Sequence, residues 1–156
     1  MTEPKTLLIL AELLRRLRLI NAGLQPTKFF TTPGVVELGP QMGDLRRPGP
    51  AIFVEISDWQ DQKMMASQHE ATITILVKGF VEHSTTPQEE THRLAYDIVK
   101  VFGEADADSL LTGTSRLVMS IGADSYTSAF EFFEQSGRGE VVVTARATYR
   151  WTHSAP

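Results

Sequence analysis

The sequence predicts a single α+β domain in which an antiparallel-rich sheet is packed on one face by two helices. Two segments place apolar residues at helical spacing, several others alternate apolar and polar residues, and a chain of 156 residues suits one domain. The predicted order is α-β-β-α-β-β over residues 1–156, with a long Pro/Gly-rich arm at 26–50 and a C-terminal tail at 153–156.

Composition narrows the class of protein. The chain has no cysteine, which excludes disulfides and thiolate metal sites. Its formal net charge of -4 argues against a protein whose main work is to grip nucleic-acid backbone. Charged residues such as Glu12, Arg15 and Arg16 interrupt the apolar N-terminal stretch before it reaches the length of a membrane span. We therefore expect a soluble protein that neither enters a membrane nor works mainly by gripping nucleic-acid backbone.

The first helix is predicted over 5–22. Leu7, Leu10, Leu14 and Leu17 recur at helical spacing, and "NAG" supplies a stop signal at the end. The arm that follows is too rich in proline and glycine for long strands. We expect short strands there, near Phe29–Thr31 and Val35–Leu38.

The main strands are predicted at 51–57, 71–81, 116–124 and 140–152, where apolar and polar residues alternate. One face of the resulting sheet should be buried. Its predicted members are Ile52, Val54, Ile56, Ile73, Ile75, Val77, Val143, Ala145 and Tyr149, covered by Leu10, Leu14, Leu17, Leu94, Ile98 and Val101.

The second helix begins with a capping pattern. Thr86 is the predicted N-cap, Pro87 occupies the first helical position, and Glu89 stands three residues after the cap, where its carboxylate can reach back to the amide of Thr86. Gly103 is the predicted end of the helix.

The same stretch contains His83 and His92, which raises the alternative of a metal or acid–base site. A helical metal site wants ligands at i and i+3 or i+4, and only Glu89 and His92 offer such a pair. Asp106 and Asp108 have calcium-loop spacing but lack the glycine and glutamate that such a loop requires. The sequence therefore predicts no metal, no cofactor and no catalytic residues.

Two predicted connections carry large apolar side chains among polar residues. The first holds Trp59, Met64 and Met65, and the second holds Phe130, Phe132 and Phe133. Such residues either fold back over the core or contact another chain, and the sequence leaves both open. We treat these six residues as a candidate interface.

The order of elements, the segment "GFVEHSTTPQEETHRLAYDIVKVF" and the aromatic final strand "ATYRW" resemble the tail terminator proteins of long-tailed (siphovirus-like) bacteriophages. The resemblance spans residues 5–152. It implies a virion structural protein without catalysis that forms a homohexameric ring, caps the tail tube and ends its polymerisation. The ring would offer a docking surface to the head-side connector protein and a lumen through which DNA passes. Such a protein is assembled in the host cytoplasm and resides in the virion tail.

Two alternatives remain. One is a head–tail connector or another tail subunit of similar fold. The other is a small α/β ligand-binding domain or enzyme with a pocket near His83, His92 and Asp97.

Overall fold

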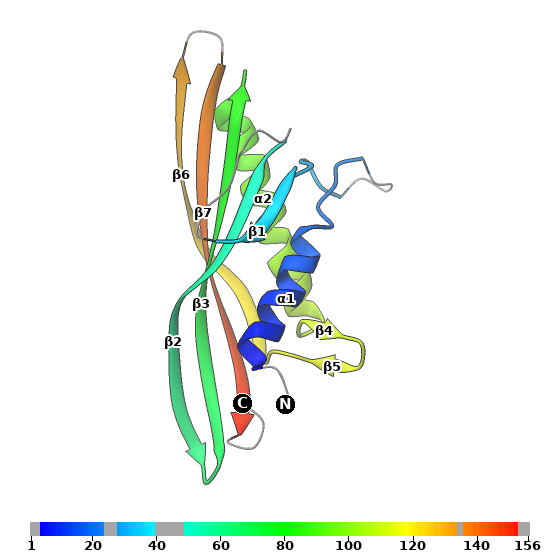
Figure 1. Cartoon of the computed structure of the whole chain (residues 1–156), viewed down its shortest axis with the longest axis vertical. Helices are drawn as coiled ribbons and strands as arrows, with labels where there is room; N and C mark the ends of the chain where they lie inside the picture. Colours follow the sequence, from blue (N-terminus) through cyan, green and yellow to red (C-terminus); the bar gives the residue numbers. More distant parts are fainter. Residues whose placement is uncertain (1–3, 24–27, 40–48, 134–135, 153–156) are drawn as a thin grey trace.

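The computed structural model describes residues 4–23, 28–39, 49–133 and 136–152, which form a long twisted sheet with two helices against one face (Figure 1). The helices are α1 (Lys5–Leu17) and α2 (Pro87–Ala107). The large sheet holds β1 (Val35–Leu38), β2 (Ala51–Met65), β3 (Gln68–Ser84), β6 (Ser120–Phe133) and β7 (Ser136–Thr152). Two short strands, β4 (Leu111–Thr112) and β5 (Ser115–Arg116), form a separate hairpin.

The strand order of the large sheet is β1-β2-β3-β7-β6, and every neighbouring pair is antiparallel except β1 with β2. This confirms the predicted fold class, including the packing of the helices on the sheet. None of the described helices is long and apolar enough to cross a bilayer.

The strands are much longer than predicted, and the two connections expected around Trp59 and Phe130 are themselves strand. Trp59 pairs opposite Ile73, and Phe130 pairs opposite Gly139. The chain reverses between β2 and β3 in a tight turn that includes Ala66, whose φ is 31°. Alternation fails as a signal here because the side chains at 57–65 and at 124–132 are exposed on both faces of their strands, so no buried face selects for apolar residues at every second position.

Three helix and arm boundaries also differ from expectation. Helix α1 ends at Leu17 and not at residue 22, and α2 continues past Gly103, whose position faces open space. The end of α2 is closed instead by Leu110, whose amide donates to the carbonyl of Ala105 at 2.7 Å. The segment Phe29–Thr31 is not a strand, whereas Val35–Leu38 is.

The core lies between the helices and one sheet face, which we call the helix face. Thirteen of the fifteen predicted core residues are buried, while Leu10 and Ile56 are partly buried against the same cluster. The stripe on α1 is rotated from the predicted one, because Ile9 and Leu13 are fully buried whereas Leu7 is 49% exposed. We call the opposite side the open face; there a smaller cluster joins Val35, Ala51, Phe53 and Phe80 near one end of the sheet.

A buried carboxylate connects the two helices. Glu12 is 6% exposed and accepts hydrogen bonds from Arg15 at 2.7 Å and from Arg16 at 2.9 Å. Arg16 also donates to Asp108, just beyond the end of α2, at 3.0 Å. The hydrogen bond from Arg15, helped by Arg16, outweighs burial and lowers the pKa of Glu12 from 4.5 to about 2.

The first prediction concerns the core. Ile75→Ala should lower the free energy of unfolding by about 2–5 kcal/mol, because Ile75 is fully buried between the sheet and the helices. Urea denaturation followed by circular dichroism measures this. The control is Thr74→Ala, one residue away on the open face, which should cost less than about 1 kcal/mol. Equal losses would contradict the assignment of the two faces.

The second prediction is a pH dependence. A carboxyl whose pKa is lowered by folding stabilises the protein above its unfolded pKa, and that contribution disappears as the pH falls through the folded pKa. Glu12→Gln should therefore cost about 1–3 kcal/mol at pH 7. The gap from the unaltered protein should shrink as the pH falls from 4.5 to about 2. Glu89→Gln is the control, since Glu89 is exposed; a gap that persists at pH 2 would contradict the prediction.

Candidate functional site

The sheet ends in two projecting hairpins, which reach past opposite ends of the helical layer (Figure 1). We call residues 58–70 the β2–β3 tip, and residues 126–133 with 136–140 the β6–β7 tip. Large apolar side chains are exposed on both. Those of the first are Trp59, Met64 and Met65, exposed by 48%, 47% and 71%; those of the second are Tyr126, Phe130 and Phe132, exposed by 44%, 48% and 54%.

Trp59 both folds back toward the core and remains partly exposed, so it combines the two roles that the sequence left open. Its indole Nε1 donates to the hydroxyl of Tyr149 at 3.1 Å, and that hydroxyl also hydrogen-bonds Thr6 in α1 at 2.7 Å. Half of the ring nevertheless remains exposed. Met64 and Met65 lie farther out along β2, and Met65 is the most accessible of the three.

The β2–β3 tip is braced by side chains of its own. His69 Nδ1 lies 2.6 Å from Asp61 Oδ2, and Trp151 Nε1 donates to Asp61 Oδ1 at 2.9 Å. The rings of His69 and Trp151 stack with centroids 4.4 Å apart. β7 also pairs with β3 along this tip, up to Thr152 opposite Gln68, so three strands reach it. The cluster therefore joins the side chains of all three strands at the tip.

The β6–β7 tip is held against the start of α2 by two glycines. A Cβ atom on Gly139 would collide with Thr91 Oγ1, and one on Gly137 would collide with the carbonyl oxygen of Glu131. The segment "SGRGE" at 136–140 is thus strand, and its glycines allow the helix to pack closely. Phe130 and Phe132 follow β6 beside this contact; the side chain of Phe133 lies outside the described residues.

The start of α2 confirms part of the capping prediction. Thr86 is the N-cap and Pro87 the first helical residue, with Glu89 in the first turn. No side-chain cap hydrogen bond is formed at this helix start, although all its residues are described. The hydroxyl of Ser84 instead accepts from the amide of Thr86 at 3.0 Å. The predicted hydrogen bonds of the capping box are therefore wrong, because the hydroxyl of Ser84, and not the carboxylate of Glu89, accepts from the amide of Thr86.

The histidines and acids considered as a chemical site are not brought together. His92 contacts Tyr126, 3.3 Å from its hydroxyl, while His83 closes β3 with a φ of 53°. Asp106 accepts from the amide of Ile121 at 3.1 Å, which is a structural role. Within the described ranges no group of three or more His, Cys, Asp or Glu side chains can hold a metal ion.

Asp97, expected near that site, holds the arm to the helix. It is fully buried, and its carboxylate accepts from the amides of Phe30 at 3.0 Å and Thr31 at 2.8 Å, and from the Thr31 hydroxyl at 2.6 Å. Three donors suit a buried carboxylate. Because the amides of Phe30 and Thr31 donate to Asp97 and not to a neighbouring strand, this segment is not a strand.

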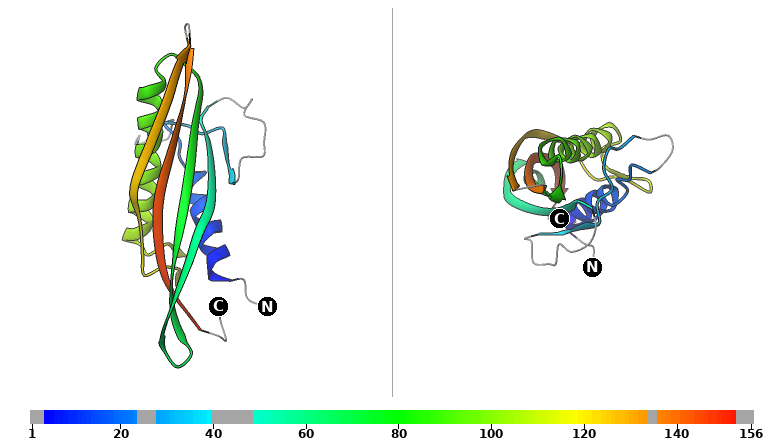
Figure 2. Two further views of the ribbon diagram at one scale, coloured as in Figure 1. Left: turned by 90° about the vertical axis from the view of Figure 1, so that its left-hand side faces the viewer. Right: turned by 90° about the horizontal axis from the view of Figure 1, so that it is seen from above.

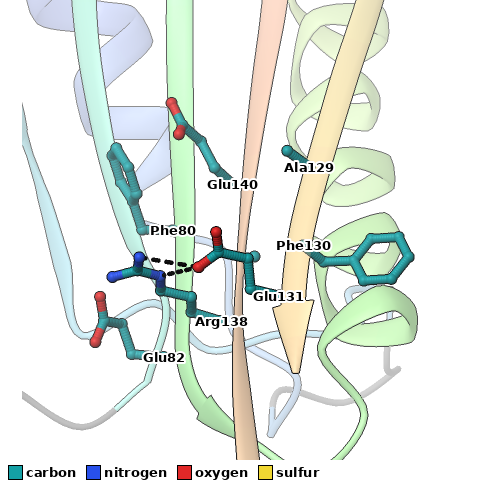
Figure 3. Close-up of a pocket in the computed structure, with 8 residues that line it drawn as sticks. Phe80, Glu82, Ala129, Phe130, Glu131, Arg138 and Glu140 are labelled. Atoms are coloured by element: carbon teal, nitrogen blue, oxygen red, sulfur yellow. Dashed lines mark hydrogen bonds and ion pairs between the residues drawn. The ribbon is translucent and has the colours of Figure 1, made fainter. Parts of the chain in front are cut away.

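The open face carries charges that are mostly neutralised across strands. Each cation pairs with a carboxylate: Lys78 with Glu55, Arg138 with Glu131, Arg146 with Asp124 and Arg150 with Glu70. Near the β6–β7 tip the pair of Arg138 and Glu131 lines a hollow of about 360 Å³ (Figure 3). Its other acids, Glu82 and Glu140, form no ion pair with any described residue. The ring of Phe130 points to the other side of β6.

Both outer edges of the large sheet are open along most of their length. β1 covers β2 only as far as Val54, so β2 from Glu55 to Met65 has a strand on one side alone among the described residues. β6 likewise pairs only with β7. Sequence reasoning missed these edges because β6 was predicted to end at residue 124. Apolar residues at 126, 130 and 132, all of one parity, were the available signal.

A scan against models of protein families finds no match, and no curated protein matches the chain.

The third prediction follows from Asp97. Asp97→Ala should cost about 2–4 kcal/mol, because it leaves buried donors without an acceptor, while Asp97→Asn should cost less because an amide oxygen still accepts. Urea denaturation measures both. Trypsin should also cut after Lys28 faster in the alanine variant, since the arm loses its anchor. Asp124→Ala, on an exposed ion pair, is the control; similar losses for Asp97 and Asp124 would contradict the anchoring role.

Proposed function

We propose that this protein is the subunit of a homo-oligomeric ring, of six copies, that caps a bacteriophage tail tube. The ring ends polymerisation of the tube and offers the surface on which the head docks, with DNA passing through its lumen. The observation that carries the proposal is the pair of projecting tips, each with exposed apolar side chains, at opposite ends of one sheet.

A cyclic ring requires two different patches on each subunit, because the front of one copy meets the back of the next. The two tips supply such patches. One presents Met64 and Met65, the other Phe130 and Phe132. Large apolar surfaces on soluble proteins mark contacts with partners. Their separation at opposite ends favours a head-to-tail contact over a two-fold dimer through a single patch.

The open face supports a lumen that conducts DNA. A channel lined with free lysine or arginine would hold a polyanion by its phosphates. Here each of Lys78, Arg138, Arg146 and Arg150 is neutralised by a carboxylate, and Glu82 and Glu140 add negative charge. A surface of this kind lets DNA slide without adhering.

The partners that follow are the tail tube protein on one side of the ring and the head-side connector protein on the other. The protein would be assembled in the host cytoplasm and located in the virion tail. A head–tail connector or another tail subunit would also form a ring, so the number of subunits does not distinguish these functions. The effect of the protein on tube length does distinguish them. The alternative of an enzyme pocket near Asp97 is weakened because that carboxylate is occupied by the arm.

The fourth prediction tests the two patches. Met65→Glu and Phe132→Glu should each leave a folded monomer, because both residues are exposed by more than half and their tips lie outside the core. Light scattering should give a ring mass for the unaltered protein and a monomer mass for each variant. A mixture of the two variants should give dimers and no rings, because each variant keeps one intact patch. Leu19→Glu is the control, since Leu19 is equally exposed on the helical side and should not prevent ring formation.

The tail function itself is tested with polymerising tail tube subunits and electron microscopy. The unaltered protein should stop tubes at a defined length, and the two variants should not. If the unaltered protein stays monomeric with tube subunits and the tubes grow on, the proposal is wrong. Rings that leave tube length unchanged would favour a connector.

A further inference from the structure

We propose that neighbouring copies are joined by strand pairing: the open edge of β6 in one copy pairs antiparallel with the open length of β2 in the next. This inference rests on the proposed ring and specifies its contact. The occupant of each edge is therefore a second copy of this chain.

The edge of β6 carries little of the usual protection against pairing. Natural edge strands are shortened, bulged, or carry proline or lysine that discourages another strand. β6 runs from Ser120 to Phe133, contains neither residue type, and has one bulge, between Ala123 and Ser125. Its two acids, Asp124 and Glu131, are both paired with arginines of β7. Beyond the bulge the edge continues without a break to Phe133, which leaves it open to a strand of another chain.

Strand directions make the junction antiparallel. β2 is antiparallel to β3, β3 to β7, and β7 to β6, so β6 runs opposite to β2 within one copy. In a ring whose axis runs roughly along the sheet, β2 of the next copy keeps the direction of β2 in the first. It therefore meets β6 antiparallel and continues the alternation of the sheet.

The two open edges are staggered along the strands. Gln60 in β2 lies level with Thr72 and, through Thr148, with Ser120 at the start of β6. The middle of β6, at Thr127, is instead level with Val142 and hence with Lys78, six residues along β3 from Thr72. Bringing the middle of each edge together therefore requires neighbouring copies to be displaced by about 20 Å along the strand direction, at about 3.3 Å per residue.

That shift matches the geometry of a closed barrel. Four strands per copy, β2, β3, β7 and β6, span roughly 19 Å at about 4.8 Å per strand. A displacement of about 20 Å along the strands over that width corresponds to strands tilted by about 45° from the barrel axis. This is at the upper end of the 35–45° typical of closed barrels. The displacement along the strands prevents neighbouring sheets from joining as one flat sheet. A closed ring of tilted strands requires a displacement of this size.

The side chains that would meet are compatible. Register places Asp58, Gln60 and Gln62 on the open face of β2, opposite Thr74, Thr72 and Glu70. Ser125, Thr127 and Ala129 lie on the same face of β6, opposite Thr144, Val142 and Glu140. With Gln60 opposite Thr127, Asp58 meets Ala129 and Gln62 meets Ser125, so these three pairs bring no like charges together.

The experiment exploits the absence of cysteine in the chain. Gln60→Cys is combined in turn with Ser125→Cys, Thr127→Cys and Ala129→Cys, which samples three registers on one face. Within one copy these positions are separated by two intervening strands, about 14 Å, beyond the reach of a disulfide. Mild oxidation should give, for at least one pair, a ladder of covalent oligomers that ends at the number of subunits in the ring.

Three controls make the result specific. Gln60→Cys with Ser128→Cys places the thiols on opposite faces and should give at least tenfold less cross-linking. Each single cysteine variant should give no dimer, whereas a dimer from one alone would overturn the head-to-tail contact. Mixing a Gln60→Cys chain with the cross-linking β6 variant should give only dimers. Circular dichroism checks that each variant is folded.

The outcomes separate this inference from the function on which it rests. Rings by light scattering without a ladder in any of the three registers would refute the strand pairing and leave the ring in place. A protein that is monomeric with and without tube subunits would refute the ring and the pairing together.

Discussion

The long antiparallel pairing of β3 with β7 is the constraint on which the rest of the structure depends. It runs from Gln68 opposite Thr152 to Ser84 opposite Gly137, with one irregularity near its end. On its helix face, Ile73, Ile75, Val77 and Val143 are fully buried and provide the surface on which both helices pack. Because the pair is longer than the helices that cover it, both ends must project. The two tips are therefore a consequence of a mismatch in length between the layers (Figure 2).

The helical layer is held to that sheet by polar contacts as well as by the core. Glu12 and Arg16 bind α1 to the residues just after α2, and Asp97 binds the arm to the middle of α2. Both carboxylates are buried, so removing either leaves donors without partners. These contacts lie on the side of the molecule away from the open face. The fold thus separates the polar groups that stabilise the subunit from the exposed groups that are available to partners.

Periodicity predicted the strand segments that have one buried face and failed where both faces are exposed. Ile52, Ile75 and Val143 alternate with polar residues because one face of the sheet is buried under the helices, and that alternation identified the strands and the core. Around Trp59 and Phe130 the side chains of both faces are exposed, so these strand segments were predicted as connections. Asp97 could not be assigned from sequence either, since its partners Phe30 and Thr31 lie more than sixty residues away. The six candidate interface residues were chosen for their apolar character, and five of them prove to be exposed on the tips.

The separation of the two tips also bears on how an assembly of this chain forms and stops. A subunit with a single adhesive edge makes dimers, whereas one with two different edges makes open chains unless the geometry closes them. In the proposed ring, the offset between the two edges along the strand direction would fix how much the strands of each copy tilt. Tilt and the number of strands per copy would then set how much of the wall each copy contributes, while the number of copies sets the diameter. The bulge between Ala123 and Ser125 on β6, and that between Ile56 and Asp58 on β2, increase local twist at the start of each open edge. Closure of the proposed ring, in preference to growth of a filament, would thus depend on features of the backbone that no side-chain motif in the sequence reveals.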